Sequence, residues 1–586
     1  MSVSPVNEIE ERSVYARARA WADADPDPDT QRELRALIDG RATGELIERM
    51  GPELTFGTAG LRGRVEAGSA RMNQAVVERT TWALAQHLIS RVLDGRELSV
   101  VIGYDARPHS RRFARAAAEV LIGAGVRVRW FDRAQPTPMV AYVARVMGAA
   151  AAIVVTASHN PRGDNGFKVY GSDARQLDRE DELAIEALRA RFGEGHPVPR
   201  VSEGRLDARI EDVPDELFER YLAELDAYLP PRASNAAELK IAYTPVHGVG
   251  LLPTSSALSR RGFTTFNAVR EQAMPDGTFP TTPFPNPEHP GTLALVTQLA
   301  RELDADLILA NDPDADRLAA GARLSGGEWG ILSGNDLGVL LADFIFEYAR
   351  PRRTPLFVTS IVSSPLLAEL CRARGARVEL TLTGFKWIWA AARALEAEGC
   401  EFVFGCEEAL GYSVSPLVRD KDGVSAAVCL AELAARCRAQ GSNLWGRLHG
   451  IYREFGVYAS AQRSMVRTGL EGQREIGSLL ETLTSQAPTE LLGDSVSEII
   501  DYRQGAETRP LWLGAASLVE LKFASGTRLL ARPSGTEPKL KIYADVRLGL
   551  SPRDSVSNVV SRARDRAEAL ANALADYMQE RAGLPG

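Results

Sequence analysis

Residues 149–161 read AAAAIVVTASHNP, an apolar run that passes directly into a polar turn. The run from Ala149 to Val155 has the length and composition of a buried strand. Two similar runs precede it, at 97–102 and 126–131, and between them residues 111–123 are Ala-rich and helical in pattern. Strands that alternate with helices in this way predict βαβ units and a largely parallel sheet.

The same alternation recurs twice farther along the chain. The second set has strands at 239–243, 264–269 and 305–310 and a helix at 249–260. The third set has strands at 356–359, 378–382 and 401–404 and a helix at 365–374. We therefore predict three α/β modules of similar plan with largely parallel sheets, although any α/β protein shows some alternation of this kind.

The pattern changes after about residue 455. A strand, a helix at 470–482, a further strand, a strand pair within 518–544 and a final helix at 553–580 predict a separate α+β domain. At the other end, residues 30–50 have the pattern of a short amphipathic helix that extends the first module. We predict four domains, at 1–208, 209–325, 326–453 and 454–586.

Composition excludes several classes of protein. The 586 residues are 45% hydrophobic and 25% charged, as in ordinary globular proteins. The net charge of −8 argues against a nucleic-acid partner held by global charge. Five scattered cysteines form neither a disulfide framework nor a zinc spacing. No apolar run has signal-peptide or membrane-spanning character, so we expect a cytoplasmic protein without a membrane partner.

The turn after the third predicted strand contains a candidate nucleophile. Ligands gather at the carboxyl ends of strands in open α/β sheets, where Ser158 would lie. With His159 and Lys168 nearby, its hydroxyl is a candidate nucleophile or phosphoryl carrier. The alternative is a plain polar turn, because Asn-Pro and Gly-Asp-Asn-Gly are turn formers.

Asp312, Asp314 and Asp316 stand at alternate positions directly after a strand. Like charges this close are unfavourable unless a cation neutralises them, and oxygen-only ligation suits Mg²⁺. An EF-hand is excluded because Arg317 and Arg323 stand where Gly and Glu are required. The alternative is a solvated acidic loop.

Two more polar loops follow strands. Glu407 and Glu408 have carboxylates that suit sugar hydroxyls, or that cap a helix. The segment from Arg532 to Lys539 combines a guanidinium with hydroxyl and glycine residues, which suits an anion cradle, or a β-turn that closes a hairpin. Each predicted domain thus has one polar loop. A cleft between four domains would unite the loops into one site for a phosphorylated polyol or sugar.

These loops and several further motifs resemble one known family. The motifs are FGTAGLRG at 56–63, GYDAR at 103–107, TASHNP at 156–161, TPVHG at 244–248, DPDADR at 312–317 and TGFK at 383–386. Over nearly its full length the chain resembles the α-D-phosphohexomutase superfamily, within it the phosphoglucomutase/phosphomannomutase enzymes. The resemblance implies three similar α/β domains with mixed sheets, a C-terminal α+β domain and an active site in the central cleft.

The resemblance also implies a reaction, the transfer of a phosphoryl group between O1 and O6 of a hexose phosphate. Ser158 would be phosphorylated in the resting enzyme, and its phosphate would contact a Mg²⁺ held by Asp312, Asp314 and Asp316. A sugar 1,6-bisphosphate would be the intermediate and activator.

Further roles follow from the same resemblance. Arg62, His159 and Lys168 would act in catalysis, and either His159 or Lys168 would accept the hydroxyl proton. The implied substrate-binding residues are Arg317, Thr383, Gly384, Lys386, Glu407, Arg532, Ser534, Gly535 and Thr536.

One departure concerns the sugar. Many family members have Ser where this chain has Ala409, two positions after Glu407. The sequence around Glu407, together with TAGLR at 58–62, is similar to a branch of the family that includes phosphopentomutases and a glucose-1,6-bisphosphate synthase. The leading prediction is a hexose-phosphate mutase for glucose or mannose; the alternatives are phosphopentomutase, bisphosphate synthase, a phosphatase or an inactive scaffold.

Overall fold

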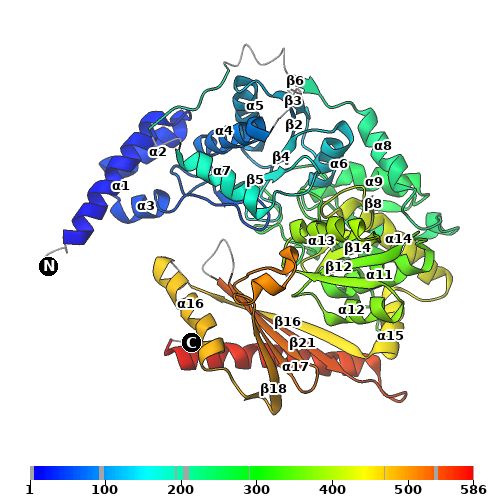
Figure 1. The fold of residues 1–586 in the computed structure, drawn as a ribbon. Coiled ribbons are helices and arrows are strands. Elements are labelled where there is room, and N and C mark those ends of the chain that lie inside the picture. The colour runs from blue at the N-terminus through cyan, green and yellow to red at the C-terminus, as the bar shows by residue number, and fades with distance from the viewer. Residues whose placement is uncertain are drawn as a thin grey trace.

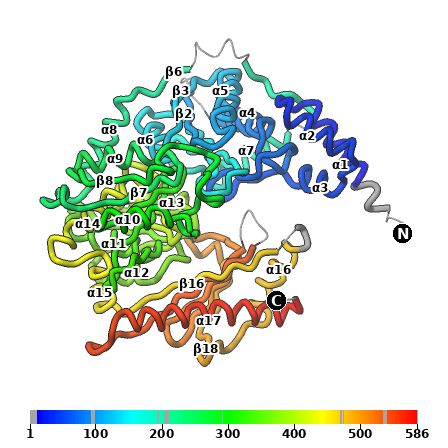
Figure 2. Tube along the Cα trace, turned by 180° about the vertical axis from the view of Figure 1, so that it is seen from behind, coloured from blue at the N-terminus to red at the C-terminus, as the bar shows by residue number. Residues whose placement is uncertain are grey.

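Four β-sheets organise the chain (Figure 1). The computed structural model describes residues 5–91, 98–191, 195–201, 210–289, 291–467, 469–533 and 539–584. Figures 1 and 2 show the sheets in an arc, from the first domain at the top to the C-terminal domain at the bottom. No helix in these ranges is both long and apolar enough to cross a bilayer.

The first sheet has the strand order β1-β5-β4-β2-β3-β6. The predicted strands at 97–102, 126–131 and 149–155 are confirmed as β2, β3 and β4, and the predicted helix at 111–123 as α5. The elements are β1 (Leu61–Arg64), β2 (Ser99–Tyr104), β3 (Arg127–Trp130), β4 (Ala151–Val155), β5 (Asp164–Tyr170), β6 (Ile210–Asp212), α4 (Gln74–Arg91), α5 (Ser110–Gly123), α6 (Thr137–Met147) and α7 (Arg179–Arg191).

Three helices precede this sheet, α1 (Pro5–Ala24), α2 (Pro28–Asp39) and α3 (Thr43–Arg49). The prediction of one helix over 30–50 was therefore wrong, because two helices share that stretch. Gly40 ends α2, its N–H bonded back to Ala36 and Ile38, and glycine is a poor helix former. The backbone leaves right-handed helical geometry at Arg41, which has a φ of 51°, and Ala42, with ψ of 63°, leads into α3.

The second and third sheets follow the plan of the first. Their orders are β11-β10-β9-β7-β8 and β13-β12-β14-β15. The second has β7 (Ile241–Thr244), β8 (Phe266–Ala268), β9 (Leu307–Asn311), β10 (Leu318–Arg323), β11 (Trp329–Ile331), α8 (Glu216–Leu225), α9 (Leu251–Arg260) and α10 (Ala294–Glu302). The third has β12 (Thr354–Ser360), β13 (Arg377–Thr381), β14 (Cys400–Glu407), β15 (Gly411–Ser413), α11 (Gly334–Tyr348), α12 (Pro365–Ala373), α13 (Phe385–Ala397), α14 (Gly423–Ala439) and α15 (Leu444–Phe455).

All three sheets share a core of three parallel strands followed by one antiparallel strand. The parallel strands β4, β9 and β14 each pair with an antiparallel neighbour that comes next in the chain, β5, β10 or β15. Each polar loop of the first three domains lies at this turn. The sheets are therefore mixed, and the predicted similarity of the three modules is confirmed. Two edge strands, β6 and β11, lie beyond the predicted boundaries at 208 and 325.

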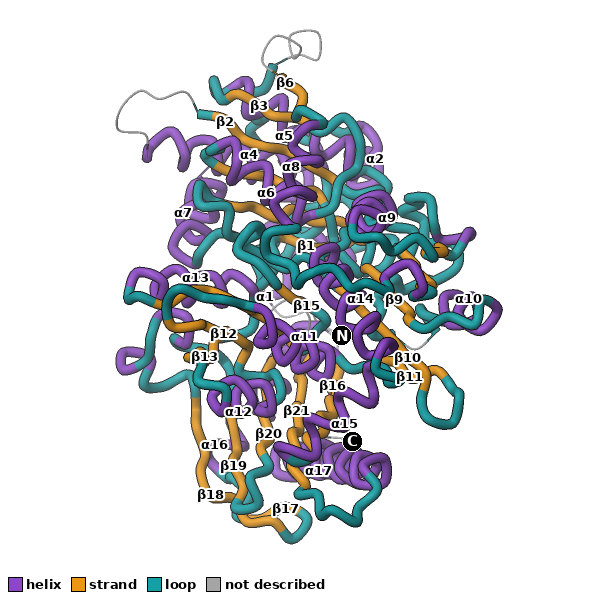
Figure 3. The backbone as a smooth tube through the Cα atoms, turned by 90° about the vertical axis from the view of Figure 1, so that its right-hand side faces the viewer, coloured by secondary structure: helices purple, strands orange, loops and turns teal. Residues whose placement is uncertain are grey.

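The C-terminal sheet is antiparallel, with the order β16-β21-β20-β19-β18-β17 (Figure 3). Helices at 470–482 and 553–580 are confirmed as α16 and α17, which contact the sheet. The predicted strand pair within 518–544 is instead three strands, because a tight turn at 524–527 closes an additional hairpin. The elements are β16 (Val457–Val466), β17 (Glu490–Leu491), β18 (Asp494–Asp501), β19 (Val519–Phe523), β20 (Arg528–Pro533), β21 (Lys539–Leu548), α16 (Gly469–Ser485) and α17 (Val556–Ala582).

Candidate active site

Ser158 lies in the turn after β4, in a strained backbone conformation. Its φ of 52° is in the left-handed region, which costs a residue with a side chain about 1–3 kcal/mol. Its Oγ donates to Asp312 Oδ2 at 2.7 Å and lies 3.1 Å from His159 Nδ1. Its N–H donates to Thr156 Oγ1 at 2.9 Å. The turn thus directs a buried hydroxyl of the first domain at a carboxylate of the second.

Arg107 holds this turn in place, a role that sequence reasoning missed. Its guanidinium lies 3.3 Å from the Asp105 carboxylate, within the GYDAR motif. It donates to four backbone carbonyls of the turn, those of Ser158, Asn160, Pro161 and Asp164, at 2.6–3.1 Å. The signal in the sequence was the motif itself, but only the folded chain shows that this side chain reaches the serine turn.

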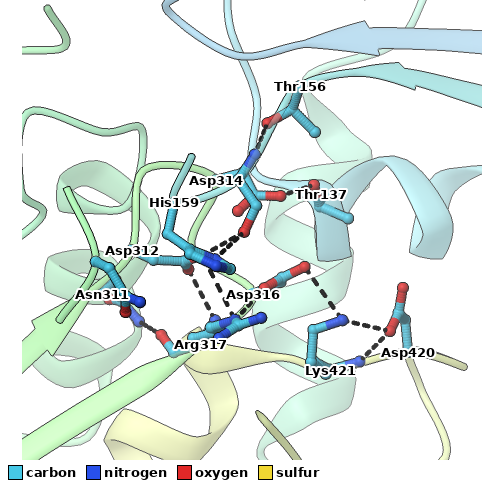
Figure 4. Close-up of polar contacts among 12 residues, drawn as sticks. Thr137, Thr156, His159, Asn311, Asp312, Asp314, Asp316, Arg317, Asp420 and Lys421 are labelled. Carbon is cyan, nitrogen blue, oxygen red and sulfur yellow. Dashed lines mark hydrogen bonds and ion pairs between the residues drawn. The ribbon is translucent and has the colours of Figure 1, made fainter. Parts of the chain in front are cut away.

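Three carboxylates converge in the turn after β9 (Figure 4). Asp312, Asp314 and Asp316 are fully buried, and each has a ligand atom within 4.8 Å of the others. Ala315 has a φ of 55°, which bends the turn so that the alternate side chains point inward. The predicted acidic cluster is therefore a buried site, and the alternative of a solvated acidic loop is wrong.

Lys168 binds one oxygen of Asp314 and one oxygen of Asp316. Lys168 Nζ donates to Asp314 Oδ2 at 2.7 Å and to Asp316 Oδ2 at 2.8 Å. Thr137 Oγ1 also donates to Asp314 Oδ2, at 2.6 Å. Burial alone would raise the pKa of Asp316, but Lys168, Lys421 and the neighbouring Arg317 hold it well below its ordinary value. Both carboxylates are thus kept ionised and oriented.

The remaining oxygens fit a cation. Oδ1 of Asp314 and Oδ1 of Asp316 are buried and form no hydrogen bond with the described residues. An unpartnered buried carboxylate oxygen is costly, and a bound ion would satisfy it. A set of carboxylate oxygens without nitrogen or sulfur ligands suits a hard divalent cation. Ser158 Oγ lies beside the same cluster through its bond to Asp312.

The two candidate proton acceptors differ in their surroundings. Burial, together with the charges of Arg317 and Arg62, lowers the pKa of His159 well below its ordinary value, so its ring is neutral. Burial would lower the pKa of Lys168 as well, but the charges of Asp314 and Asp316 raise it. Lys168 therefore remains a charged partner of the carboxylates, while the His159 ring is free to exchange a proton with the serine hydroxyl.

Two arginines have unused donors beside the serine. Arg62 on β1 donates to Asn160 Oδ1 at 3.1 Å, but its buried Nε has no hydrogen bond with a described residue. The Arg317 Nε is likewise buried without a hydrogen bond, 3.9 Å from Asp312 Oδ2. Burial and the charge of Arg317 lower the pKa of Arg62. An anion between the two guanidiniums would relieve this repulsion, as phosphoryl oxygens do.

The predicted sugar loops of the third domain contact one another. Gly384 precedes α13 with a φ of 123°, and its N–H donates to Glu407 Oε1. A Cβ at Gly384 would lie 2.7 Å from Thr58 Cγ2, so this close approach requires glycine. The Thr383 hydroxyl is buried without a partner among the described residues, which leaves it available to a ligand.

Lys386 forms an ion pair with a carboxylate of the first domain. Its ammonium donates to Glu182 Oε1 on α7 at 2.8 Å, in a buried ion pair between the first and third domains. The structure thus places this predicted substrate-binding residue on α13, where a carboxylate engages it.

The fourth predicted loop is described only in part. Arg532 lies near the end of β20, and its buried Nε has no hydrogen bond with a described residue. It pairs in register with Lys541 of β21, whose pKa is lowered by burial and by Arg532. Two neighbouring cationic side chains repel each other, so the binding of an anion between them is favourable. The other predicted members, Ser534, Gly535 and Thr536, lie outside the described residues.

The raised pKa of Glu407 can be tested through the pH dependence of stability. Burial and the charge of Glu408 raise its pKa to about 7. Between about pH 4.5 and about pH 7 the folded protein therefore holds a proton that the unfolded chain has lost, so the free energy of unfolding falls as pH rises. The full shift corresponds to about 3 kcal/mol. We expect Glu407→Gln to gain Tm relative to the wild type as pH increases through this range. Thermal melts at matched pH measure it, and a pH-independent difference would contradict it.

With this geometry in view, comparisons with known proteins identify the family. Models of the phosphoglucomutase/phosphomannomutase α/β/α domains I, II and III match residues 53–193, 219–324 and 333–453. The open form of parafusin, a phosphoglucomutase from Paramecium, shares the fold with a TM-score of 0.67. That likeness covers 91% of this chain and 97% of the other at 16% identity.

Curated relatives are similar over most of the chain. A "Probable phosphomannomutase" of Haemophilus influenzae is 38% identical over 494 residues, 83% of this chain and 94% of that protein. A phosphopentomutase of Mus musculus is 35% identical, over 88% of this chain and 87% of that protein. A phosphoglucomutase of Staphylococcus epidermidis is 32% identical, over 87% and 93%. The chain therefore belongs to the phosphoglucomutase/phosphomannomutase family of the α-D-phosphohexomutase superfamily, and it is an enzyme of the intramolecular phosphotransferase (isomerase) type.

Proposed function

We propose that the protein is a Mg²⁺-dependent phosphohexomutase that moves a phosphoryl group between O1 and O6 of glucose or mannose phosphate. One observation carries the proposal. The hydroxyl of Ser158 lies 2.7 Å from Asp312, in a carboxylate cluster with two buried oxygens that accept no hydrogen bond from a described residue. Relatives named phosphomannomutase and phosphoglucomutase support a hexose substrate.

The proposed reaction has two matched phosphoryl transfers. In the first, the P–Oγ bond of phosphorylated Ser158 breaks as the free sugar hydroxyl bonds to phosphorus from the opposite side. The sugar hydroxyl would release its proton to solvent. The serine oxygen would take up a proton from the neutral His159 ring, 3.1 Å away, and the ring would regain one from solvent, so the number of protons is unchanged. The sugar 1,6-bisphosphate then turns in the site, and its other phosphate returns to Ser158 by the reverse steps.

In an in-line transfer the entering and leaving oxygens lie on opposite sides of phosphorus, and this determines which protein groups would face each oxygen. His159 lies beside Oγ, so it serves the serine, and the sugar hydroxyl stands on the far side of phosphorus. Arg62 and Arg317 would bind the oxygens of the transferring phosphate with their unused N–H donors. A divalent cation held by Asp312, Asp314 and Asp316, when bound, would neutralise negative charge on the same oxygens.

The third and fourth domains would hold the rest of the substrate. Glu407 and the Thr383 hydroxyl, which has no hydrogen-bond partner in the described part of the chain, suit sugar hydroxyls. The phosphate that does not react would lie against Arg532 and the loop with Ser534, Gly535 and Thr536. Lys386 would contact the substrate only after its ion pair with Glu182 has broken.

A pentose substrate is the second candidate, and a specific observation favours it. The mouse relative, 35% identical to this chain, is named phosphopentomutase. Ala409, in place of the serine that many family members have there, also removes a hydroxyl expected at the sugar. The same Ser158 chemistry would then connect the 1-phosphate and 5-phosphate of ribose or deoxyribose.

Parallel assays with glucose 1-phosphate, mannose 1-phosphate and ribose 1-phosphate separate the two candidates. We expect kcat/KM for at least one hexose phosphate to exceed that for ribose 1-phosphate by about 10-fold or more. The Ser158→Ala variant serves as the blank in each assay. A ribose 1-phosphate value above both hexose values would contradict the hexose assignment.

A further inference from the structure

The three N-terminal helices are a part of the first domain that the chemistry above does not use. They precede residue 53, where the match to the family model of domain I begins. Trp21 on α1 is 2% exposed, and the Arg79 guanidinium of α4 lies 4.3 Å from its ring centroid. Leu34 on α2 and Leu46 on α3 are fully buried in the same core cluster as β2 and β4. The helices lie at the outer edge of the domain (Figure 1) and share its core.

Arg49, in the last turn of α3, joins two of these helices to the segment that follows β1. Its side chain is only 9% exposed. The Nε donates to Glu45 Oε1 at 2.9 Å, and Nη1 donates to Glu33 Oε1 on α2. The Nη2 lies 3.7 Å from Glu66 Oε2, and Glu33 Oε2 accepts the N–H of Ala67 at 3.0 Å. One buried guanidinium thus fixes α2, α3 and the segment after β1 relative to one another.

The backbone of this segment also rests on the end of α3. The N–H of Ala70 donates to the carbonyl of Arg49 at 2.9 Å. Gly68 has a φ of 116°, and a Cβ there would lie 2.4 Å from the same carbonyl oxygen, so the close approach requires glycine. The segment folds back onto β1, because the N–H of Met72 donates to the carbonyl of Arg64 at 2.9 Å. Contacts from α3 therefore reach the last residue of β1.

The position of β1 depends on these contacts because β1 is the edge strand of the first sheet. It has four residues, and in the described sheet it pairs with β5 alone. An edge strand has ladder hydrogen bonds on one side only. Arg62 lies on β1 opposite Gly166, and its Nη1 donates to Asn160 Oδ1 at 3.1 Å in the turn that contains Ser158. A displacement of β1 would therefore move Arg62 relative to the serine.

We propose that Arg49 is a positioning residue, through which α2 and α3 hold β1 so that Arg62 is presented to the phosphate on Ser158. The inference rests on the proposed role of Arg62 in binding the transferring phosphate. It gives the N-terminal helices a function in the reaction, which they exert through the segment after β1. Because the phosphate on Ser158 belongs to the enzyme, a displaced Arg62 would slow the transfer and change the affinity for the sugar phosphate little.

A second arginine of these helices offers a matched control. Arg35 on α2 pairs with Asp23 on α1 at 3.0 Å, and the two side chains are 53% and 73% exposed. Arg35→Met and Arg49→Met each remove one cation from the N-terminal helices and keep an unbranched stem. Of the two arginines, only Arg49 contacts the described segment after β1.

A double-mutant cycle between Arg49 and Arg62 tests the proposal in the full-length enzyme. We expect Arg49→Met to lower kcat on a hexose phosphate about 3- to 10-fold with KM within about 2-fold, and to increase hydrogen–deuterium exchange at residues 61–72. In the Arg62→Met background the same change should lower kcat by less than about 2-fold, because the group through which Arg49 acts is then absent. Arg35→Met should match the wild type in kcat and in exchange.

Equal losses of kcat from Arg49→Met in the two backgrounds would overturn the proposal, because a merely structural role lowers kcat independently of Arg62. A loss in Arg35→Met equal to that in Arg49→Met would overturn it as well. If Arg49→Met does not fold, Glu33→Gln, which weakens the same ion pair, replaces it in the cycle with the same two outcomes.

Failure of this proposal and failure of the proposed function give different results. Hydrogen–deuterium exchange needs no substrate, so unchanged exchange at residues 61–72 in Arg49→Met refutes the positioning role even in a protein without mutase activity. Unchanged kcat in Arg62→Met would refute the proposed role of Arg62. Losses that multiply in an active mutase would refute the positioning role alone.

Discussion

Ser158→Ala is expected to abolish a covalent phosphate adduct and to lower turnover by about 1,000-fold or more. The reason is chemical, because alanine has no oxygen to carry the phosphoryl group between the two sugar positions. Intact-mass analysis of purified wild-type protein should show the phosphate in a fraction of molecules, and peptide mapping should locate it on Ser158. Steady-state assays measure the loss of turnover.

A neighbouring serine serves as the control for this variant. Ser172 lies exposed on the same domain, so Ser172→Ala should retain the adduct and full activity. Unchanged turnover in Ser158→Ala, with circular dichroism equal to that of the wild type, would refute the phosphoserine role.

Asp314→Asn has the second largest expected effect, a loss of about 100-fold or more in kcat/KM. The amide keeps the size of the side chain but removes one negative charge from the proposed cation site. The change also weakens the interaction with Lys168, whose Nζ lies 2.7 Å from Asp314 Oδ2. Mg²⁺ titration of activity should show a higher half-saturating concentration. EDTA should inactivate the wild type, and added Mg²⁺ should restore it.

Asp304→Asn is the matched control. Asp304 lies in the same domain, and its exposed carboxylate pairs with Arg323 at the surface. An exposed ion pair of this kind contributes little to the free energy of unfolding, so this variant should fold normally. It should retain wild-type kinetics and the same Mg²⁺ requirement. If Asp314→Asn folds normally and its Mg²⁺ titration matches that of the wild type, the proposed metal site is wrong.

The sequence was sufficient for the architecture and for the main loops because both depend on local pattern. Apolar runs of strand length identified β2, β4, β9 and β12, and the polar turns after the parallel strands marked Ser158, Asp312 and Glu407. Ser158 and Asp312, 154 residues apart and in different domains, meet at 2.7 Å. The sequence predicted that the polar loops share one cleft, but the contact between these two side chains depends on how the first and second domains pack.

Other features depend on contacts between domains, which no local pattern encodes. Arg107 and Lys421 carry no periodicity that reveals their partners, yet the first holds the serine turn and the second lies against Asp316. Lys386 was predicted at the substrate, but the folded chain brings Glu182 from α7 within 2.8 Å of it. The break between α2 and α3 lies at Gly40 and Arg41, and the left-handed φ of 51° at Arg41 leaves no signal in the local amphipathic pattern.

The most direct test of the account follows one phosphoryl group. Enzyme carrying radiolabelled phosphate on Ser158 is mixed with unlabelled glucose 1-phosphate or mannose 1-phosphate, and the products are separated by chromatography. Transfer from Ser158 predicts that the label appears first in the sugar 1,6-bisphosphate and then in the 6-phosphate. Release of the label as inorganic phosphate, with none in the bisphosphate, would identify a phosphatase and contradict the proposed mutase.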